Sequence, residues 1–151
     1  PLAREVEYAK GYLTIQKMRY KDKLEFEIDV EPSILNIPLI KLVLQPIIEN
    51  AIYHGLKYKE SKGLLQVKGF MKDGNAVLQV IDNGVGMDEE TLSHIYDKHK
   101  VNYHSNGVGV YNVQKRLKLY YGENYGITYE SEKGVGTTAT ITIPGIQEES
   151  I

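Results

Sequence analysis

Residues 78–86 read LQVIDNGVG, an apolar run followed by an acidic residue and a pair of glycines. The apolar run predicts a buried strand that ends at Ile81. The carboxyl group of Asp82, at the end of such a strand, is costly to bury unless it is hydrogen-bonded. Asp82 therefore either caps the following turn or accepts a hydrogen bond from the amino group of a ligand. Gly84 and Gly86 permit positive φ and let a ligand approach the backbone closely.

Strands are predicted on both sides of this stretch. Residues 64–71 and 76–81 form a hairpin around Asp73-Gly74, a dipeptide typical of tight turns. Residues 127–132 and 137–143 alternate as a second hairpin, and residues 24–29 alternate as a separate strand. Apolar residues at helical spacing predict helices over residues 5–22 and 39–56 and from residue 108 or 110 to residue 121, and a short helix is predicted over residues 88–96. This order predicts an α/β (α+β) two-layer sandwich, a mixed and mostly antiparallel sheet with helices on one face.

The helix predicted over residues 39–56 is the most apolar of the chain. Pro38 suits its first turn, where a missing N–H costs nothing. Pro46 lies inside the predicted helix and should bend it, because proline removes a backbone hydrogen bond there. Gly55 is placed to close the helix.

Polar residues stand near the end of this helix. Asn50 and His54 are four residues apart and share a face, while Glu49 lies about 100° around the helix from Asn50. The group is either the solvated end of a core helix or a magnesium site. A magnesium site is chemically reasonable because Mg²⁺ takes only one or two protein oxygens together with substrate phosphates.

Two more Gly-x-Gly pairs occur, at residues 107–109 and 134–136. The first directly precedes the helix that ends at Tyr121, where free N–H groups and the helix dipole suit a phosphate. Cationic side chains just upstream could add to such a site: Lys98, Lys100 and His104. The dinucleotide fingerprint, the P-loop and the protein-kinase catalytic loop are all missing from the sequence.

Composition excludes several classes of function. The 151 residues carry a formal net charge of −2, which disfavours a nucleic-acid-binding surface over the whole domain. There is no cysteine, which excludes disulfides, thiolate zinc sites and cysteine nucleophiles. No apolar run approaches the roughly 18–20 residues that span a bilayer, so we expect no direct membrane contact. Because the chain starts at Pro1, we expect it to be a piece of a longer protein.

Four segments together resemble the GHKL superfamily of ATP-binding domains. More narrowly, they resemble the catalytic domain of bacterial sensor histidine kinases of the LytS/YesM-like subgroup. The segments are residues 44–55 (LQPIIENAIYHG), 82–87 (DNGVGM), 107–122 and 134–137 (GVGT), in the order of the family's N box and three glycine boxes. The resemblance implies the GHKL fold, with ATP and Mg²⁺ as ligands.

The resemblance also implies roles for single residues. Asn50 would ligate the Mg²⁺ that bridges the ATP phosphates, with Glu49 and His54 beside it as the catalytic group. Asp82 would accept a hydrogen bond from the adenine amino group, through a site that Thr137 supports with a water. Residues 87–106 would be the lid over ATP. The glycine boxes would contact ATP through Gly84, Gly86, Gly107, Val108 and Gly109, whereas Arg116 would pack structurally.

Two departures from the pattern bear on activity. GHKL ATPases place a general-base Glu four residues before the magnesium-binding Asn, and Pro46 stands there in this chain. This favours phosphoryl transfer to a separate acceptor over hydrolysis. Tyr53 occupies a position that is often Lys in the subgroup, so a phosphate contact from this position is not expected. None of the chain's four histidines stands in an acceptor box.

The implied organisation is a helix over residues 1–22 that follows an absent acceptor region, an ATP-binding domain over 23–146 and a tail over 147–151. The partners would be a histidine phosphoacceptor and dimerisation domain of the same kinase and a downstream response regulator, with no nucleic acid. The location would be the cytoplasmic side of a membrane-anchored protein. Alternative functions are a GHKL ATPase, a protein serine kinase or a non-enzymatic nucleotide-binding module.

Overall fold

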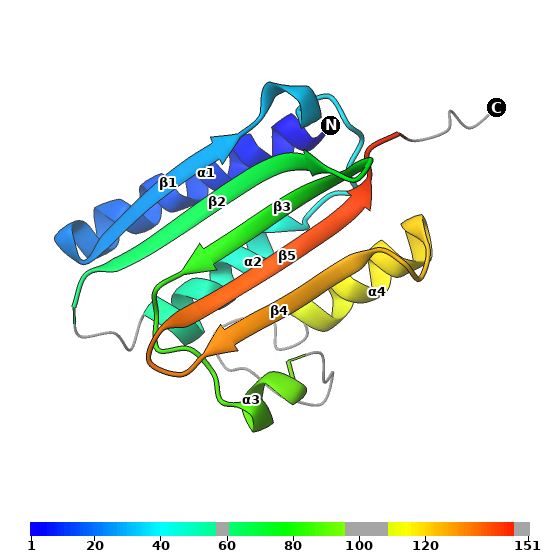
Figure 1. Ribbon diagram of the computed structural model, residues 1–151. Helices are drawn as coiled ribbons and strands as arrows, with labels where there is room; N and C mark the ends of the chain where they lie inside the picture. The colour runs from blue at the N-terminus through cyan, green and yellow to red at the C-terminus, as the bar shows by residue number, and fades with distance from the viewer. Residues whose placement is uncertain (57–60, 96–108, 147–151) are drawn as a thin grey trace.

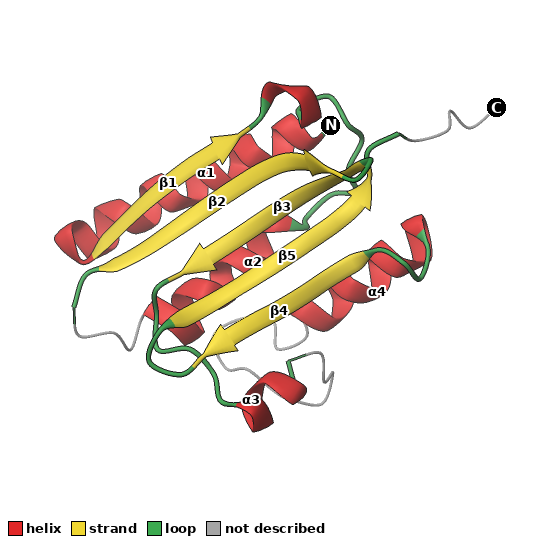
Figure 2. Ribbon diagram, viewed as in Figure 1, coloured by secondary structure: helices red, strands yellow, loops and turns green. Residues whose placement is uncertain are grey.

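The computed structural model describes residues 1–56, 61–95 and 109–146, and these residues form a sheet backed by helices (Figures 1 and 2). The sheet has five strands in the order β1-β2-β3-β5-β4. β1 pairs with β2 in parallel, and the other neighbours pair antiparallel. The strands are β1 (Leu24–Val30), β2 (Gly63–Lys72), β3 (Asn75–Asp82), β4 (Gly126–Glu132) and β5 (Gly136–Pro144). The predicted mixed, mostly antiparallel sheet is confirmed.

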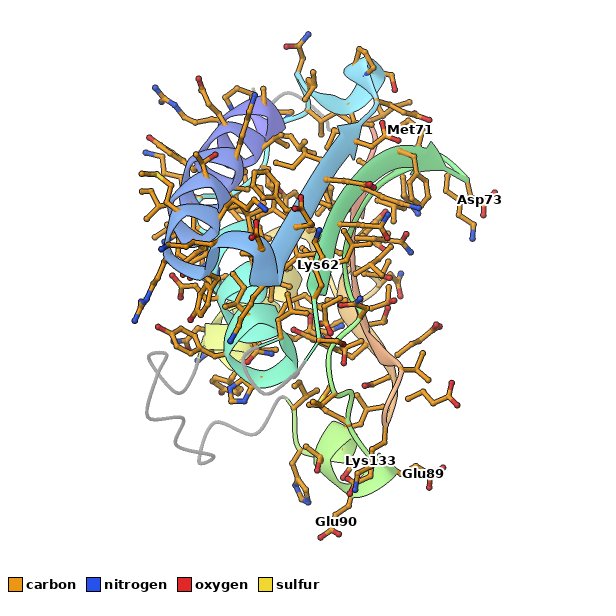
Figure 3. All side chains as sticks on the ribbon, turned by 90° about the vertical axis from the view of Figure 1, so that its left-hand side faces the viewer. Lys62, Met71, Asp73, Glu89, Glu90 and Lys133 are labelled. Atoms are coloured by element: carbon orange, nitrogen blue, oxygen red, sulfur yellow. The ribbon has the colours of Figure 1, made fainter. Side chains whose placement is uncertain are left out.

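Among the described residues, three helices cover one face of the sheet, and the side chains of the other face point away from them (Figure 3). They are α1 (Leu2–Tyr20), α2 (Leu44–Asn50) and α4 (Gly109–Tyr121). α2 continues without a break as the π-helical turn η3 (Ala51–Leu56). The core between the layers contains fully buried side chains from both: Leu13, Leu44, Ile48, Leu65, Leu78, Leu117 and Ile141. No helix in the described part of the chain is long and apolar enough to cross a membrane.

The smaller elements follow local sequence signals. Both central residues of the β2–β3 turn have positive φ, 51° at Asp73 and 81° at Gly74, as the Asp-Gly dipeptide predicts. The short helix α3 (Glu89–Ser93) starts after Asp88, whose Oδ1 accepts a hydrogen bond from the Thr91 N–H at 2.8 Å. Two 3₁₀ turns, η1 (Lys21–Lys23) and η2 (Pro32–Ile34), flank β1.

The helix predicted from residue 39 was wrong at its start, because α2 begins only at Leu44. The preceding segment follows an irregular path in which Leu42 has a φ of 59°. Its backbone groups are bonded to side chains far along the chain. Arg116 donates from Nη1 to the Lys41 carbonyl and from Nη2 to the Leu42 carbonyl, and Tyr121 donates to the Pro38 carbonyl at 3.3 Å.

The shorter helix changes the roles expected of two residues. Pro46 is the third residue of α2, so its missing N–H belongs to the first turn, where no partner within the helix exists. The predicted bend at Pro46 was therefore wrong. Gly55 does not close the helix as predicted, because it lies within the turn that runs on to Leu56.

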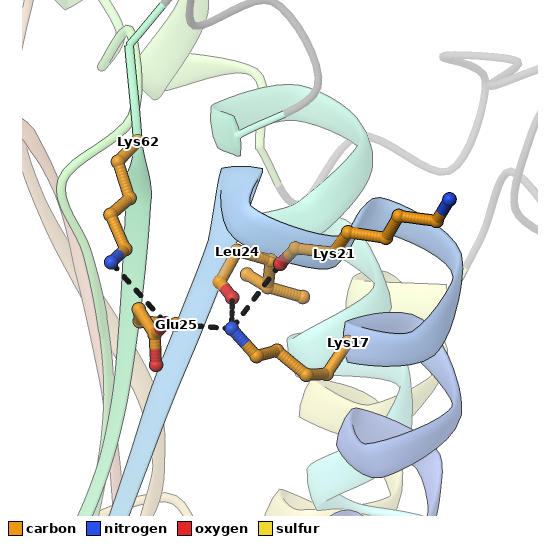
Figure 4. A network of polar contacts seen from close by, with 5 residues as sticks. All are labelled: Lys17, Lys21, Leu24, Glu25 and Lys62. Atoms are coloured by element: carbon orange, nitrogen blue, oxygen red, sulfur yellow. Dashed lines mark hydrogen bonds and ion pairs between the residues drawn. The ribbon is translucent and has the colours of Figure 1, made fainter.

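α1 is joined to the rest of the fold at both ends. At its start, the Leu2 and Ala3 N–H groups donate to the carbonyls of Ile37 and Leu35, at 2.8 and 2.9 Å. At its end, Lys17 Nζ donates to the Leu24 carbonyl at 2.7 Å and to Glu25 Oε1 at 2.6 Å (Figure 4). The hydrogen bonds from Lys17 and Lys62 hold the pKa of Glu25 below its usual value.

Candidate functional site

A pocket lies between the helical layer and the sheet, at the end of the sheet where β3 finishes. It contains about 360 Å³ of empty space, including the part open to solvent. The helix α2 and the turn η3 supply Ile47, Asn50, Ala51, His54 and Gly55. The sheet supplies Val80, Asp82, Tyr129, Thr137 and Ala139, and the loop after β3 supplies Gly86 and Met87.

Asp82 is the buried carboxyl group of this pocket, with 5% of its surface exposed. Its Oδ1 accepts a hydrogen bond from the Gly84 N–H at 2.9 Å. Burial raises the pKa of Asp82 to about 6, although the backbone N–H groups of Gly84 and Thr137 act in the opposite direction. The turn-capping role is therefore present, and the same carboxyl group also lines the pocket. Its contact with a ligand amine stays a prediction.

Gly55 and Gly84 bring the backbone of η3 and of the β3 loop together. A Cβ at Gly84 would overlap the backbone of Gly55, and the Val85 N–H donates to the Gly55 carbonyl at 3.1 Å. A Cβ at Gly55 would lie 2.7 Å from Asp82 Oδ1. Glycine is required at position 84 because the backbone of Gly55 leaves no room for a side chain, and a side chain at position 55 would displace the Asp82 carboxyl group.

The β3 loop is also bonded to the turn between β4 and β5. Gly86 has a φ of 70°, and a Cβ there would overlap the Glu132 carbonyl. The Gly134 N–H donates to the Val85 carbonyl at 2.7 Å. Two of the three glycine pairs therefore pack against each other, and Gly86 of the first pair lines the pocket. α3 and this turn lie at the same end of the molecule, where Figure 3 labels Glu89, Glu90 and Lys133.

Thr137 lies opposite Asp82 in the β3–β5 pairing. Its Oγ1 is 2.7 Å from Ser131 Oγ, which accepts a hydrogen bond from the Met87 N–H at 2.8 Å. Sequence reasoning did not single out Ser131. This chain of contacts connects the start of the segment predicted as a lid to Thr137, which lines the pocket.

Only some of the residues predicted to surround the metal line the pocket. Asn50 and His54 both line the pocket, as their spacing on one helical face predicts. Glu49 is not among the lining residues, and its Oε1 accepts a hydrogen bond from Gln45 Nε2 at 3.1 Å. In the described part of the chain, no three His, Cys, Asp or Glu side chains are grouped to hold a metal. The donor set fits Mg²⁺ only through the amide oxygen of Asn50 and oxygens of a ligand.

The start of α4 stands near the start of α2, since a Cβ at Gly109 would lie 3.6 Å from Pro46 Cβ. Gly107, Val108 and most of the predicted lid, with Lys98, Lys100 and His104, lie outside the described residues. Arg116 has the structural role predicted for it, because its guanidinium binds two backbone carbonyls.

Several pocket residues were missed by sequence reasoning: Ile47, Ala51, Val80, Tyr129 and Ala139. A signal for some of them exists. Residues two apart on a strand share a face, so Val80 shares the face of Asp82, and Ala139 shares that of Thr137. Val80 and Ala139 are also paired across β3 and β5.

The two-layer fold and its pocket indicate the class of protein to which the chain belongs. The family model described as "Histidine kinase-, DNA gyrase B-, and HSP90-like ATPase" matches residues 36–147, and the chain belongs to this family. The resemblance to GHKL catalytic domains predicted from the sequence is confirmed.

Two relatives indicate which members of this family the chain resembles. The chain is 32% identical over 143 residues to "Sensor histidine kinase YesM" of Bacillus subtilis (strain 168), covering 95% of this chain and 23% of that protein. It is 35% identical over 126 residues to "Sensor protein LytS" of Oceanobacillus iheyensis, covering 82% of this chain and 22% of that protein. The chain thus spans about a quarter of the length of these relatives.

Solved structures agree on the fold. The nucleotide-free catalytic domain of histidine kinase ThkA superposes with a TM-score of 0.69 at 17% identity, covering 95% of this chain and 92% of that chain. The mycobacterial sensor histidine kinase MprB superposes with a TM-score of 0.64 at 20% identity, covering 93% of both chains. These likenesses identify the architecture as that of histidine kinase catalytic domains.

Proposed function

We propose that this chain is the ATP-binding part of a sensor histidine kinase and transfers the γ-phosphoryl group of ATP to a histidine on a separate domain. The proposal depends mainly on Asp82, a buried carboxyl group in a pocket that Gly55 and Gly86 also line. Such a group accepts a hydrogen bond from the exocyclic amine of adenine, a contact of roughly 1.5–3 kcal/mol to a charged acceptor. The membership of the family supports the same assignment.

The chain's residues have distinct tasks in this reaction. Asp82 and the apolar residues Val80 and Ala139 hold the base, while the amide oxygen of Asn50 faces the phosphates. A bound Mg²⁺ would be held by Asn50 and would neutralise phosphate charge. The N–H groups at the start of α4 add positive potential for the phosphates.

In the transfer step the imidazole nitrogen of the acceptor forms a bond to Pγ. The bond from Pγ to the oxygen that bridges the β and γ phosphates breaks, and ADP leaves with that oxygen. The chain contributes positioning and charge stabilisation, which is where most catalysis of phosphoryl transfer arises. Pro46 offers no base at the position where related ATPases carry a Glu, so water is not activated there.

The partners follow from this proposal. The acceptor histidine would belong to a dimerisation domain of the same kinase, and a response regulator would receive the phosphoryl group next. The domain would sit on the cytoplasmic side of a bacterial membrane in which the full kinase is anchored. The length of the relatives leaves room for such additional parts.

Titration of a non-hydrolysable ATP analogue tests the binding site. We expect binding that Mg²⁺ strengthens, and a loss of about tenfold or more in Asp82→Asn. Absence of binding in the wild type, or an unchanged affinity in Asp82→Asn, would contradict the proposal.

Radiolabelled ATP tests the transfer. The chain alone should form no phosphohistidine, and it should label a histidine when mixed with the acceptor domain of its own kinase. Steady hydrolysis of ATP without the acceptor would favour an ATPase, and stable phosphoserine on a partner would favour a serine kinase. Binding without any labelling of a histidine would favour a non-enzymatic nucleotide-binding module.

A further inference from the structure

Glu5 is buried although it lies outside the pocket. In the described part of the chain the buried carboxyl side chains are those of Asp82 and Glu5, each with 5% of its surface exposed. Asp82 lines the pocket, whereas Glu5 belongs to α1 and does not. A carboxyl group is costly to remove from water unless it is hydrogen-bonded or paired. The burial of Glu5 therefore needs an explanation in the fold.

The partner of Glu5 is the backbone at the start of α2. Glu5 Oε1 accepts a hydrogen bond of 2.6 Å from the N–H of Val43, the residue that precedes Leu44. The first N–H groups of a helix have no partner within it and carry partial positive charge. Val43 has no side-chain oxygen that could cap α2. The cap of α2 is thus supplied by a different helix, 38 residues earlier in the chain.

The same segment is held from the opposite side by α4. The guanidinium of Arg116 binds the carbonyls of Lys41 and Leu42, next to the N–H that Glu5 binds. Leu42 is held in a left-handed conformation, which an L-residue adopts at a cost of about 1–2 kcal/mol. Since α1 binds the N–H and α4 binds the carbonyls, the start of α2 has little freedom to shift along its axis.

The position of this start matters because α2 carries the pocket. Asn50 lies seven residues after Val43, a distance of about 10 Å along a helix. A short helix moves as one unit, so a displacement at Val43 reaches Asn50 and the neighbouring Ala51. α1 also approaches α2 about two turns further along, where Tyr12 lies near Glu49. There burial raises the pKa of Tyr12 to about 12, and the nearby Glu49 adds to the rise.

We propose that Glu5 is a positioning residue for the nucleotide site. By binding the Val43 N–H it sets the axial position of α2 and so directs the amide oxygen of Asn50 toward the metal-bound phosphates. This inference rests on the proposed function. It makes the Mg²⁺-dependent part of ATP affinity depend on the docking of α1.

The test measures the Kd of a non-hydrolysable ATP analogue without Mg²⁺ and with Mg²⁺. The quantity compared is the ratio of the first Kd to the second. We expect Glu5→Ala to reduce this ratio about three- to tenfold, toward the value of Asn50→Ala. Glu5→Gln keeps an acceptor oxygen at the same reach and should restore most of the ratio. A purely structural role would lower the melting temperature and leave the ratio of the folded protein unchanged.

Gln114→Ala is the matched control. Gln114 binds the backbone N–H and carbonyl of Ile127, at 2.7 and 3.0 Å, on the side of α4 toward β4. Its loss should lower the melting temperature and leave the ratio as in the wild type.

A wild-type ratio in Glu5→Ala would overturn the inference while leaving the proposed function intact. Absence of Mg²⁺-dependent binding in the wild type would instead overturn the proposed function. If Glu5→Ala does not fold, Glu5→Asp takes its place, because it keeps the charge but is one methylene too short to reach Val43. An unchanged ratio in Glu5→Asp would then overturn the inference.

Discussion

Gly55 stands so close to Asp82 that a Cβ at position 55 would lie 2.7 Å from Asp82 Oδ1. The two residues are 27 positions apart in sequence and meet because η3 packs against the end of β3. The contact leaves room for the carboxyl group only where position 55 has no side chain. The glycine of the helix and the acid of the strand therefore form one structural unit.

Gly55→Ala should displace the carboxyl group of Asp82 and weaken ATP binding about tenfold or more. The added methyl group would overlap Asp82 Oδ1, so either the side chain rotates or η3 moves. Titration of an ATP analogue measures the loss. An affinity equal to the wild type would contradict this prediction.

The matched control is Gly11→Ala on the exposed side of α1, where a Cβ meets nothing within 4 Å. Because alanine is the better helix former, this change should stabilise the fold by up to about 1 kcal/mol. ATP affinity should stay at the wild-type value.

ATP binding should weaken as the pH falls through about 6. Burial raises the pKa of Asp82 to about 6, and protonation removes the charged acceptor for the adenine amino group. We expect the Kd to rise between pH 7.5 and pH 5, by up to about tenfold per unit below the pKa. Asp82→Asn is the control, since its weaker binding should retain only the pH dependence of ATP itself. Parallel pH profiles for the two proteins would refute the assignment.

The same group affects the stability of the ligand-free protein with a defined sign. The pKa of Asp82 is about 6 in the folded chain, against an ordinary value of 3.8. The folded state therefore binds the proton more tightly, and the Asp82 contribution to unfolding free energy falls as pH rises from about 4 to 6. The change amounts to roughly 2–3 kcal/mol, and above pH 6 the contribution is level. Urea unfolding of the wild type and Asp82→Asn across this range measures the difference.

Arg116→Ala should lower the free energy of unfolding by about 1–2 kcal/mol. It removes two charge-assisted hydrogen bonds to the carbonyls of Lys41 and Leu42, from a partly exposed site. Arg116→Lys should not restore the loss, because one ammonium group cannot bind both carbonyls as the planar guanidinium does. Urea unfolding is the measurement, with the exposed Lys115→Ala as a control that should change stability by less than about 0.5 kcal/mol. Full recovery in Arg116→Lys would contradict the assigned role.

The strands were predictable because their signals are local. Alternation places Leu65, Val67, Leu78, Val80 and Ile141 on the buried face, and the Asp-Gly turn sets the β2–β3 register. The start of α2 was not predictable in this way. Apolar spacing over residues 39–43 favours a helix, but contacts from Glu5, Arg116 and Tyr121 hold the segment in another conformation. Tertiary contacts of this kind regularly override local propensity.

The functional site was likewise predictable where its signals are local, and not where residues distant in sequence meet. Asp82 and the glycine pairs could be located by sequence because residue type and order carry the signal. The structural role of the glycines could not be predicted, because Gly84 and Gly86 contact distant backbone at Gly55 and Glu132. Local reasoning assigned Gly55 to a helix cap, and only the folded chain places it against Asp82.

The stability of Pro46→Ala distinguishes the predicted helix, which begins at residue 39, from the observed α2, which begins at Leu44. In a helix that began at residue 39, Pro46 would lie in the interior, and its replacement would gain about 3 kcal/mol of stability. In the structure Pro46 lies in the first turn of α2, where its missing N–H costs nothing and its fixed φ suits the helix. Replacement by alanine then mainly increases the freedom of the unfolded chain, and we expect a loss of about 0.4–1 kcal/mol. Urea unfolding gives the sign directly, and a gain of 2 kcal/mol or more would show that α2 extends toward residue 39 in solution.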